Sequence, residues 1–233
     1  MTWTLEPTSL GRVAVPPSLP PGFALFCTTR DFEGRLTPEL AQAITGVVRE
    51  RFGIESTLTT CTQVHGATVT KARRDPRWRE CDSCDALWSE EKQTALGIKI
   101  ADCLPVTLID PERGVIANVH SGWRGAVQQI TAATIDAVPL DPPSAYSYLG
   151  PSIRVCCFEV GEEVAAQFDA RYVDRSFAKP HVDLVAFTKD ILVARGFTRI
   201  SDSELCTRCE GSPFHSYRRD GSTGGRNLTI VAQ

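Results

Sequence analysis

The sequence predicts a single compact α+β domain, and three observations support that prediction. Strand-like and helix-like runs mix along the chain without the strict βαβ repeat of a doubly wound parallel sheet. No internal repeat or low-complexity linker divides the chain. A chain of 233 residues is also long enough to bury roughly 70% of its unfolded surface in one core. We expect one domain over residues 22–233, preceded by a Pro-rich leader over residues 1–21.

The first third of the chain predicts one helix among short strands. An apolar run at 23–28 has strand character. Thr37, Pro38 and Glu39 supply an N-cap, a first-turn proline and a first-turn acid, so a helix is expected to begin there. Gly53 is expected to end it. Two Thr- and Val-rich strands and then a charged loop should follow, at 58–64, 67–72 and 73–85.

The middle and the end of the chain continue this mixture. The most apolar part predicts three strands, at 96–101, 105–109 and 115–120, and the Asp-Pro-Glu-Arg-Gly spacer before the third favours a hairpin turn. Apolar residues at helical spacing then predict a helix over 125–138. The remainder predicts a strand at 146–149, helices at 161–168 and 182–195, a strand at 198–200, a turn-rich tail at 206–225 and a last strand at 228–232.

The composition excludes several functional classes. A net charge of −3 without any run of Lys or Arg argues against a dedicated nucleic-acid binder and against a membrane-surface patch. No apolar stretch approaches the roughly 18 residues of a membrane helix, and prolines interrupt the first thirty residues, so we expect no signal peptide. Nine cysteines, an odd number, indicate reduced thiols in a cytoplasmic protein.

Three residues with ligating side chains stand where the predicted apolar strands end. They are His65, Cys103 and His120. Strand ends that meet at one sheet edge can bring distant residues together, and two imidazoles with one thiolate suit zinc, leaving a fourth position for water or substrate. The alternative is that all three are ordinary strand-end polar groups, since their separations of 38 and 17 residues match no recognised metal spacing.

The segment after His120 is a second candidate feature. Small residues and Arg124 stand where the next helix should begin, an arrangement that favours an anion such as phosphate. The alternative is a plain helix start with Arg124 in a structural ion pair. The chain has only four histidines, which excludes a multicopper centre, because such centres are built mainly from imidazoles.

The tail and the remaining cysteines leave alternatives open. Arg218, Arg219 and Arg226 lie in a Gly-rich turn region that is either a lid or anion clamp or a solvated loop. The two Cys-x-x-Cys pairs, at 81–84 and 206–209, suggest a four-thiolate zinc site, although their separation is not that of a zinc ribbon. The neighbouring cysteines at 156–157 are expected to be small buried residues, and His181 and His215 to have surface or supporting roles.

Five segments, taken in order, resemble the laccase-domain family. They are Gln-Val-His-Gly at 63–66, Ala-Asp-Cys-Leu-Pro-Val at 101–106, Val-His-Ser-Gly-Trp-Arg-Gly at 119–125, the Gly-Pro-Ser-Ile to Val-Gly segment at 150–161, and Ser-Tyr-Arg-Arg-Asp-Gly at 216–221. The family has been called multicopper polyphenol oxidases and peptidoglycan editing factors. Its members are described as purine nucleoside phosphorylases with adenosine deaminase activity. The resemblance spans residues 22–231.

The resemblance implies a fold, a cofactor and an activity. The implied fold is a layered α/β/β/α arrangement of mixed sheets, similar to the cysteine-hydrolase toxin fold. The implied cofactor is zinc on His65, Cys103 and His120, with copper as the alternative metal. The implied activity is phosphorolysis of adenosine, inosine, guanosine and methylthioadenosine to the base and the sugar 1-phosphate, together with deamination of adenosine to inosine.

Roles for individual residues follow from the resemblance and the chemistry together. Expected catalytic groups are Cys103, His120 and Asp102, with Asp85 as a further acid–base candidate. Expected nucleoside- or phosphate-binding groups are Arg124, Gln63 and Arg218. The expected partners are a nucleoside and phosphate, with no nucleic acid and no membrane, and the chain is expected to be a monomer or weak dimer.

The sequence departs from the family pattern at three places. Arg154 and Val155 replace an expected Gly-Pro, Cys84 replaces an acidic residue or glycine, and His215 replaces an aromatic residue.

Three rival functions stay open. They are a metal-free cysteine hydrolase that edits peptidoglycan precursors through Cys103 and His120, a copper-dependent phenol oxidase, and a non-enzymatic small-molecule binder.

Overall fold

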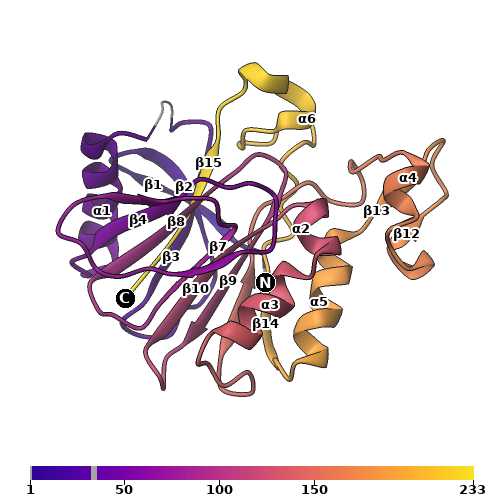
Figure 1. Cartoon of the computed structure of the whole chain (residues 1–233). Coiled ribbons are helices and arrows are strands. Elements are labelled where there is room, and N and C mark those ends of the chain that lie inside the picture. Colours follow the sequence, from indigo (N-terminus) through magenta and orange to yellow (C-terminus); the bar gives the residue numbers. More distant parts are fainter. Residues whose placement is uncertain (1, 33–35) are drawn as a thin grey trace.

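Two mixed β-sheets packed face to face form the centre of this computed structural model, which describes residues 2–32 and 36–233 (Figure 1). In spatial order, the seven-stranded sheet contains β1 (Thr4–Thr8), β2 (Gly11–Val15), β3 (Ala24–Thr28), β15 (Asn227–Ala232), β8 (Thr94–Ile100), β4 (Thr57–Cys61) and β6 (Arg79–Cys81). The six-stranded sheet contains β14 (Arg199–Asp202), β11 (Tyr146–Leu149), β9 (Leu104–Asp110), β10 (Val115–Ser121), β7 (Ala86–Ser89) and β5 (Val69–Lys71). A separate pair is formed by β12 (Val173–Asp174) and β13 (His181–Val182).

Helices cover the outer faces of both sheets. The helices are α1 (Pro38–Phe52), α2 (Trp123–Val127), α3 (Ile130–Ala137), α4 (Glu162–Ala165), α5 (Leu184–Ala194) and α6 (Tyr217–Asp220), with short 3-10 turns at Ala170–Tyr172 and Gly221–Thr223. One apolar cluster joins α1 to the larger sheet, a second joins α3 and α5 to the smaller sheet, and a third fills the space between the sheets. The predicted single α+β domain with mixed sheets is therefore confirmed.

Several elements follow the local sequence as expected. Helix α1 has Thr37 as its N-cap, with the side chain accepting a hydrogen bond from the Leu40 amide, and it ends at Gly53 in the left-handed region (φ 69°). Strands β9 and β10 form the predicted hairpin, with Val115 opposite Asp110. Strands β3, β8, β11, β14 and β15 lie within two residues of their predicted positions.

Other elements differ from the expectation for identifiable reasons. The helix predicted over 125–138 is broken into α2 and α3 at Gln129 (φ 62°), because Ala126 packs in one core cluster and Ile130 in another. The loop predicted at 73–85 contains β6, a charged edge strand that pairs only with β4 through its backbone. Helix α5 begins later than predicted because the Asp183 side chain caps it, accepting from the amides of Val185 and Ala186.

The N-terminal segment and the short strand β7 carried no clear pattern in the sequence. The segment expected as a Pro-rich leader at 1–21 contains β1 and β2, which pair with each other, and β2 also pairs with β3. Pro7 lies within β1, and the other four prolines follow β2. Strand β7 pairs with both β10 and β5. Within the part of the chain that is described, no helix is both long enough and apolar enough to cross a membrane.

A buried asparagine joins the two sheets across their apolar interface. Asn118 lies on β10 of the smaller sheet, and its side-chain amide donates to the carbonyls of Leu96 (3.0 Å) and Thr229 (2.8 Å) on the larger sheet. Its Oδ1 accepts from the Thr107 hydroxyl at 3.2 Å. Because all of these atoms are buried, the hydrogen bonds fix the relative position of the sheets that carry the site described below.

Replacing Asn118 with alanine should therefore weaken the fold. The Asn118→Ala variant loses three buried hydrogen bonds, and we expect a loss of about 1–3 kcal/mol in the free energy of unfolding, measured by urea denaturation. Thr45→Ala, which removes a hydroxyl from the surface of α1, serves as the control and should change stability by less than about 0.5 kcal/mol. Equal stability of the two variants would contradict a structural role for Asn118.

Candidate metal centre

Three ligating side chains meet where the chain passes from the larger sheet to the smaller one. Cys103 lies in the short connection between β8 and β9, which belong to different sheets. His120 lies near the end of β10, directly opposite Pro105 at the start of β9. His65 lies in the loop between β4 and β5. The ligating atoms of His65, Cys103 and His120 all lie within 4.8 Å of one another, so the structure brings together the three residues that the sequence singled out.

A buried carboxylate holds two of these residues in place. Asp85, just before β7, accepts hydrogen bonds from the amides of Val64 (3.3 Å), His65 (2.9 Å) and Gly66 (2.7 Å). Its Oδ1 also lies 2.8 Å from Nδ1 of His120, and its backbone carbonyl accepts from the His120 amide. His65 has a positive φ of 60°, a conformation that these bonds stabilise. Asp85 therefore fixes the loop that carries His65 and the ring of His120.

The charges in the site reinforce one another. Burial raises the pKa of Asp85, but the hydrogen bond from His120 and the amides of Gly66 and His65 lower it below its usual value. Burial lowers the pKa of His120, yet Asp85 and Cys103 together raise it to about 9. Burial raises the pKa of Cys103, but hydrogen bonds with His120 and His65 lower it to about 6. Cys103 is thus favoured as a thiolate near neutral pH, the form in which cysteine acts as a ligand or nucleophile.

Glycine is required next to the cluster because the space is small. A Cβ atom on Gly122 would lie 2.9 Å from the Sγ atom of Cys103 and 3.3 Å from the His65 ring. A Cβ atom on Gly125 would lie 3.1 Å from the carbonyl oxygen of Gly66. The two glycines of the 119–125 motif therefore let the start of α2 pass directly beside the ligands.

The donor set fits a catalytic metal ion. One histidine presents its second ring nitrogen to a carboxylate, the arrangement that usually fixes the tautomer and orientation of a metal ligand. Two imidazole nitrogens and one thiolate form a set that suits zinc. Among the described residues, this group contains three ligands, which leaves a further coordination position for water or substrate.

The predicted substrate-binding residues have different surroundings. Arg124 is exposed, lies over the Trp123 ring at 4.5 Å, and forms no ion pair with any described residue, contrary to the structural alternative. Arg124 is the second residue of α2, a helix of only five residues. The Gln63 amide exchanges two hydrogen bonds of 2.7 Å with the backbone of Lys99 on β8, beyond the point where the pairing of β4 with β8 ends.

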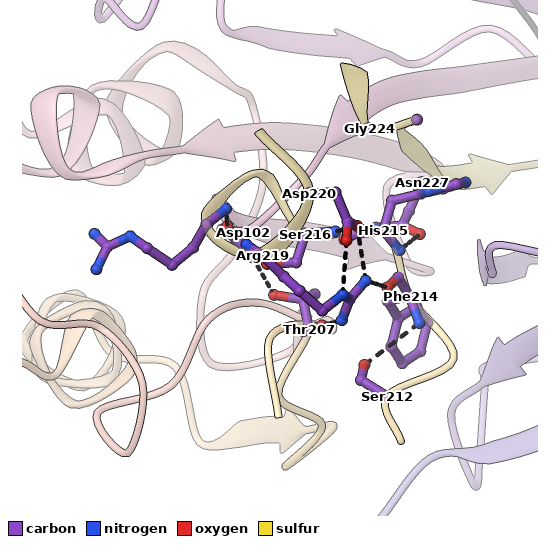
Figure 2. Close-up of polar contacts among 12 residues, drawn as sticks. Asp102, Thr207, Ser212, Phe214, His215, Ser216, Arg219, Asp220, Gly224 and Asn227 are labelled. Carbon is purple, nitrogen blue, oxygen red and sulfur yellow. Dashed lines mark hydrogen bonds and ion pairs between the residues drawn. The ribbon is translucent and has the colours of Figure 1, made fainter. Parts of the chain in front are cut away.

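The C-terminal tail is attached to the site through Asp102. One carboxylate oxygen of Asp102 accepts from the Thr207 hydroxyl at 2.6 Å (Figure 2). The other accepts from the Arg218 amide at 2.7 Å. The Arg218 guanidinium donates to the carbonyl of Glu159. Asp102 has a φ of 88° and immediately precedes Cys103. Nothing in the sequence indicated Thr207 as its partner.

Arg219 is the structural centre of the same tail. Its guanidinium forms two bonds of 2.8 Å with Asp220 and donates to the carbonyls of Thr207 (3.0 Å) and Phe214 (2.7 Å), as Figure 2 shows. The Arg226 guanidinium donates to two neighbouring backbone carbonyls. These internal bonds argue against the solvated loop, and a role for this region as a lid or anion clamp stays a prediction.

Comparison with known proteins gives a consistent result. The family model described as multi-copper polyphenol oxidoreductase laccase matches residues 38–233. Adenosine deaminase RL5, from an unknown prokaryotic organism, is 34% identical over 191 residues, which cover 72% of this chain and 72% of that protein. A purine nucleoside phosphorylase of Deinococcus radiodurans is 34% identical over 177 residues, covering 72% of this chain and 67% of its own. The crystal structure of Neisseria meningitidis protein NMB0706 has a TM-score of 0.77 at 26% identity, covering 94% of this chain and 98% of that chain.

A methyl group at position 122 should disrupt the cluster. In Gly122→Ala the new Cβ would lie 2.9 Å from the Cys103 sulfur, so the ligands must shift. We expect the affinity for added Zn2+ to fall about tenfold or more, measured in a competition titration with a chelator. The control is Gly46→Ala on α1, where a Cβ meets nothing within 4 Å and a better helix former should stabilise slightly. Unchanged zinc affinity in Gly122→Ala would contradict the geometry described for the ligands.

Removing the charge of Asp85 should weaken metal binding without removing a ligand. Asp85→Asn keeps the size of the side chain but loses the carboxylate that orients His120, so we expect zinc affinity to fall about 10- to 100-fold. Asp82→Asn makes the same change on an exposed side chain three residues earlier and should leave the affinity unaltered. The same competition titration measures both, and equal affinities would show that Asp85 does not orient the ligand.

Proposed function

The chain belongs to the family described as multi-copper polyphenol oxidoreductase laccase, and on that basis we propose that it is a zinc-dependent purine nucleoside phosphorylase that also deaminates adenosine. Two relatives that match over two thirds or more of their length are named adenosine deaminase and purine nucleoside phosphorylase. The proposed substrates are adenosine, inosine, guanosine and methylthioadenosine, which yield the base and the sugar 1-phosphate.

One observation carries the proposal: His65, Cys103 and His120 converge, and the buried Asp85 orients His120. These three side chains are the proposed zinc ligands. When bound, zinc would lower the pKa of a water molecule and polarise a leaving group or carbonyl at the open position. Cys103 would remain a thiolate there, because His120 and His65 favour that form.

The other proposed roles follow from what each side chain contacts. Arg124 is exposed, lies two residues after Gly122 and forms no ion pair with a described residue, so its guanidinium is available to hold phosphate in two hydrogen bonds. Phosphorolysis then forms a bond from a phosphate oxygen to the anomeric carbon, while the bond to the base nitrogen breaks. The base leaves with a proton that a neighbouring group or water must supply.

Three residues expected at the active site are held by contacts within the protein, which favours supporting roles for them. Asp102, expected to be a catalytic group, has both carboxylate oxygens engaged by Thr207 and Arg218, which favours positioning of Cys103 over proton transfer. Gln63 is likewise committed to the Lys99 backbone, so we propose that it supports the loop that carries His65. Arg218 is held through its amide and guanidinium, and it would meet substrate only by giving up its bond to Glu159.

A second candidate is favoured by the ionisation of the same residues. Cys103, His120 and Asp85 form a connected series in which the thiol pKa falls to about 6 and the imidazole pKa rises to about 9. That arrangement resembles the nucleophile, base and orienting acid of a cysteine hydrolase. It would suit hydrolysis of an amide in a peptidoglycan precursor, and it agrees with the expected similarity to the cysteine-hydrolase toxin fold.

Copper-dependent phenol oxidation is the weakest of the proposals. Four histidines cannot furnish a multicopper cluster, and one site with two imidazoles and a thiolate would lack the further coppers that reduce oxygen.

The predicted state of the protein is a monomer or weak dimer in the cytoplasm. Its predicted small-molecule partners are a nucleoside and phosphate.

The proposed function predicts a specific set of products. Untagged protein incubated with adenosine and phosphate should release adenine and ribose 1-phosphate, and without phosphate it should form inosine only. His65→Ala should lose both activities together with one equivalent of zinc, because it removes a ligand. The measurement is product separation by chromatography beside elemental mass spectrometry.

Chelation separates the two candidates, and matched variants test whether Cys103 is required. Cys103→Ser should abolish turnover of adenosine, whereas Cys81→Ser changes a half-buried thiol outside the cluster and should leave turnover intact. Strong chelators should inactivate the zinc enzyme. Activity that survives chelation but is lost on thiol alkylation would instead identify Cys103 as a nucleophile and overturn the zinc proposal.

A further inference from the structure

Four cysteines from two distant loops meet outside the site already described. Cys156 and Cys157 lie between β11 and α4, whereas Cys206 and Cys209 lie between β14 and α6. Their sulfur atoms are all within 4.8 Å of one another, and all four are free thiols. The partners that the sequence suggested for the 206–209 pair, at 81–84, are therefore wrong. The expectation that Cys156 is buried is also wrong, because its side chain is exposed.

The distances within this group match a tetrahedral metal site. A zinc–sulfur bond of about 2.3 Å in a regular tetrahedron places neighbouring sulfurs about 3.8 Å apart. The Cys156 sulfur lies 3.7 Å from the sulfurs of Cys157 and Cys209, and the sulfurs of Cys157 and Cys209 are 3.6 Å apart. A disulfide would require about 2.05 Å. The spacing of these three sulfurs is that expected of thiolates around a common ion, and the Cys206 sulfur lies within 4.8 Å of each of them.

We propose that Cys156, Cys157, Cys206 and Cys209 bind one zinc ion as a closed, four-thiolate structural site. Four protein ligands leave no open coordination position, which distinguishes a structural zinc from a catalytic one. The site is separate from that of His65, Cys103 and His120, and among the described residues these are the two groups of histidine, cysteine and acidic side chains that meet closely enough to hold a metal.

Positive groups around the cysteines would balance the charge of such a site. Zinc with four thiolates carries a net charge of −2. Nη1 of Arg208 lies 3.9 Å from the Cys157 sulfur. The backbone N–H groups of Arg154, Arg208 and Cys209 also donate to the Cys206 sulfur. Donation of amide hydrogens to a sulfur favours the thiolate, the ligating form.

The proposed zinc ion would hold the two cysteine loops together next to the site of His65, Cys103 and His120. Thr207, between the two tail cysteines, donates its hydroxyl to Asp102, and its amide donates to the carbonyl of Ser152. The amide of Ile153 donates to the carbonyl of Asp102. Both cysteine loops therefore bond to the residue that precedes Cys103, so a metal that ties them together would hold Asp102 in its strained conformation.

Metal content gives the first test. Untagged wild-type protein should contain two zinc equivalents per chain, one for each group, by elemental mass spectrometry. Cys209→Ser should lose one equivalent, and His65→Ala should lose the other. Cys81→Ser is the matched control and should lose neither. Retention of both equivalents by Cys209→Ser, or loss of all zinc in His65→Ala, would overturn the proposal.

Cobalt provides a second test whose main arm leaves all four cysteines unchanged. In His65→Ala loaded with Co2+, only the four-thiolate site should hold the ion, and it should show the intense near-ultraviolet absorption of thiolate-to-cobalt charge transfer. Cys209→His, which keeps a ligand, should retain cobalt with weaker absorption. Bound cobalt without that absorption, or a disulfide among the four cysteines in intact-mass analysis, would contradict the proposal. Neither readout uses adenosine turnover, so the result is independent of the proposed activity.

Discussion

The buried carboxylate of Asp85 is the interaction on which the rest of the site depends. It accepts three successive backbone amides of the loop at 64–66 and contacts the ring of His120. A buried carboxylate without these partners would destabilise the fold strongly. Moving the loop away from β10 would leave Asp85 without some of them, and this cost holds the loop and β10 together. The same contact raises the pKa of His120, which in turn helps to lower that of Cys103. One charge thus sets both the shape and the ionisation of the ligands.

The parts of the fold that could be predicted are those decided locally. The capped helix α1, the hairpin of β9 and β10, and the apolar strands have residue patterns that specify them without help from distant segments. Strand β6 and the break before α3 are decided elsewhere, because β6 exists only through backbone pairing with β4, and Gln129 turns where two separate core clusters must both be filled. Neither cause leaves a periodic pattern in the sequence.

The same division explains the candidate sites. His65, Cys103 and His120 could be singled out because each stands at or next to the end of a predicted apolar strand, and strand ends can converge at a sheet edge. The four-cysteine group could not be assembled correctly, because Cys-x-x-Cys spacing identifies a ligand pair but not its partner. The partner is set by the parallel pairing of β11 with β14, which brings the loops that follow these strands side by side.

That pairing also explains a departure from the family pattern. Arg154, where a Gly-Pro was expected, extends from the loop after β11 and forms two hydrogen bonds of 2.8 Å with Asp202 at the end of β14. Burial raises the pKa of Asp202, but Arg154 and Lys189 lower it to about 2, so this ion pair persists throughout the neutral range. The arginine therefore clamps the two cysteine loops from the strand side while its amide faces Cys206. A charged residue at this position is compatible with the fold because its ion pair with Asp202 joins the two loops that carry the cysteines.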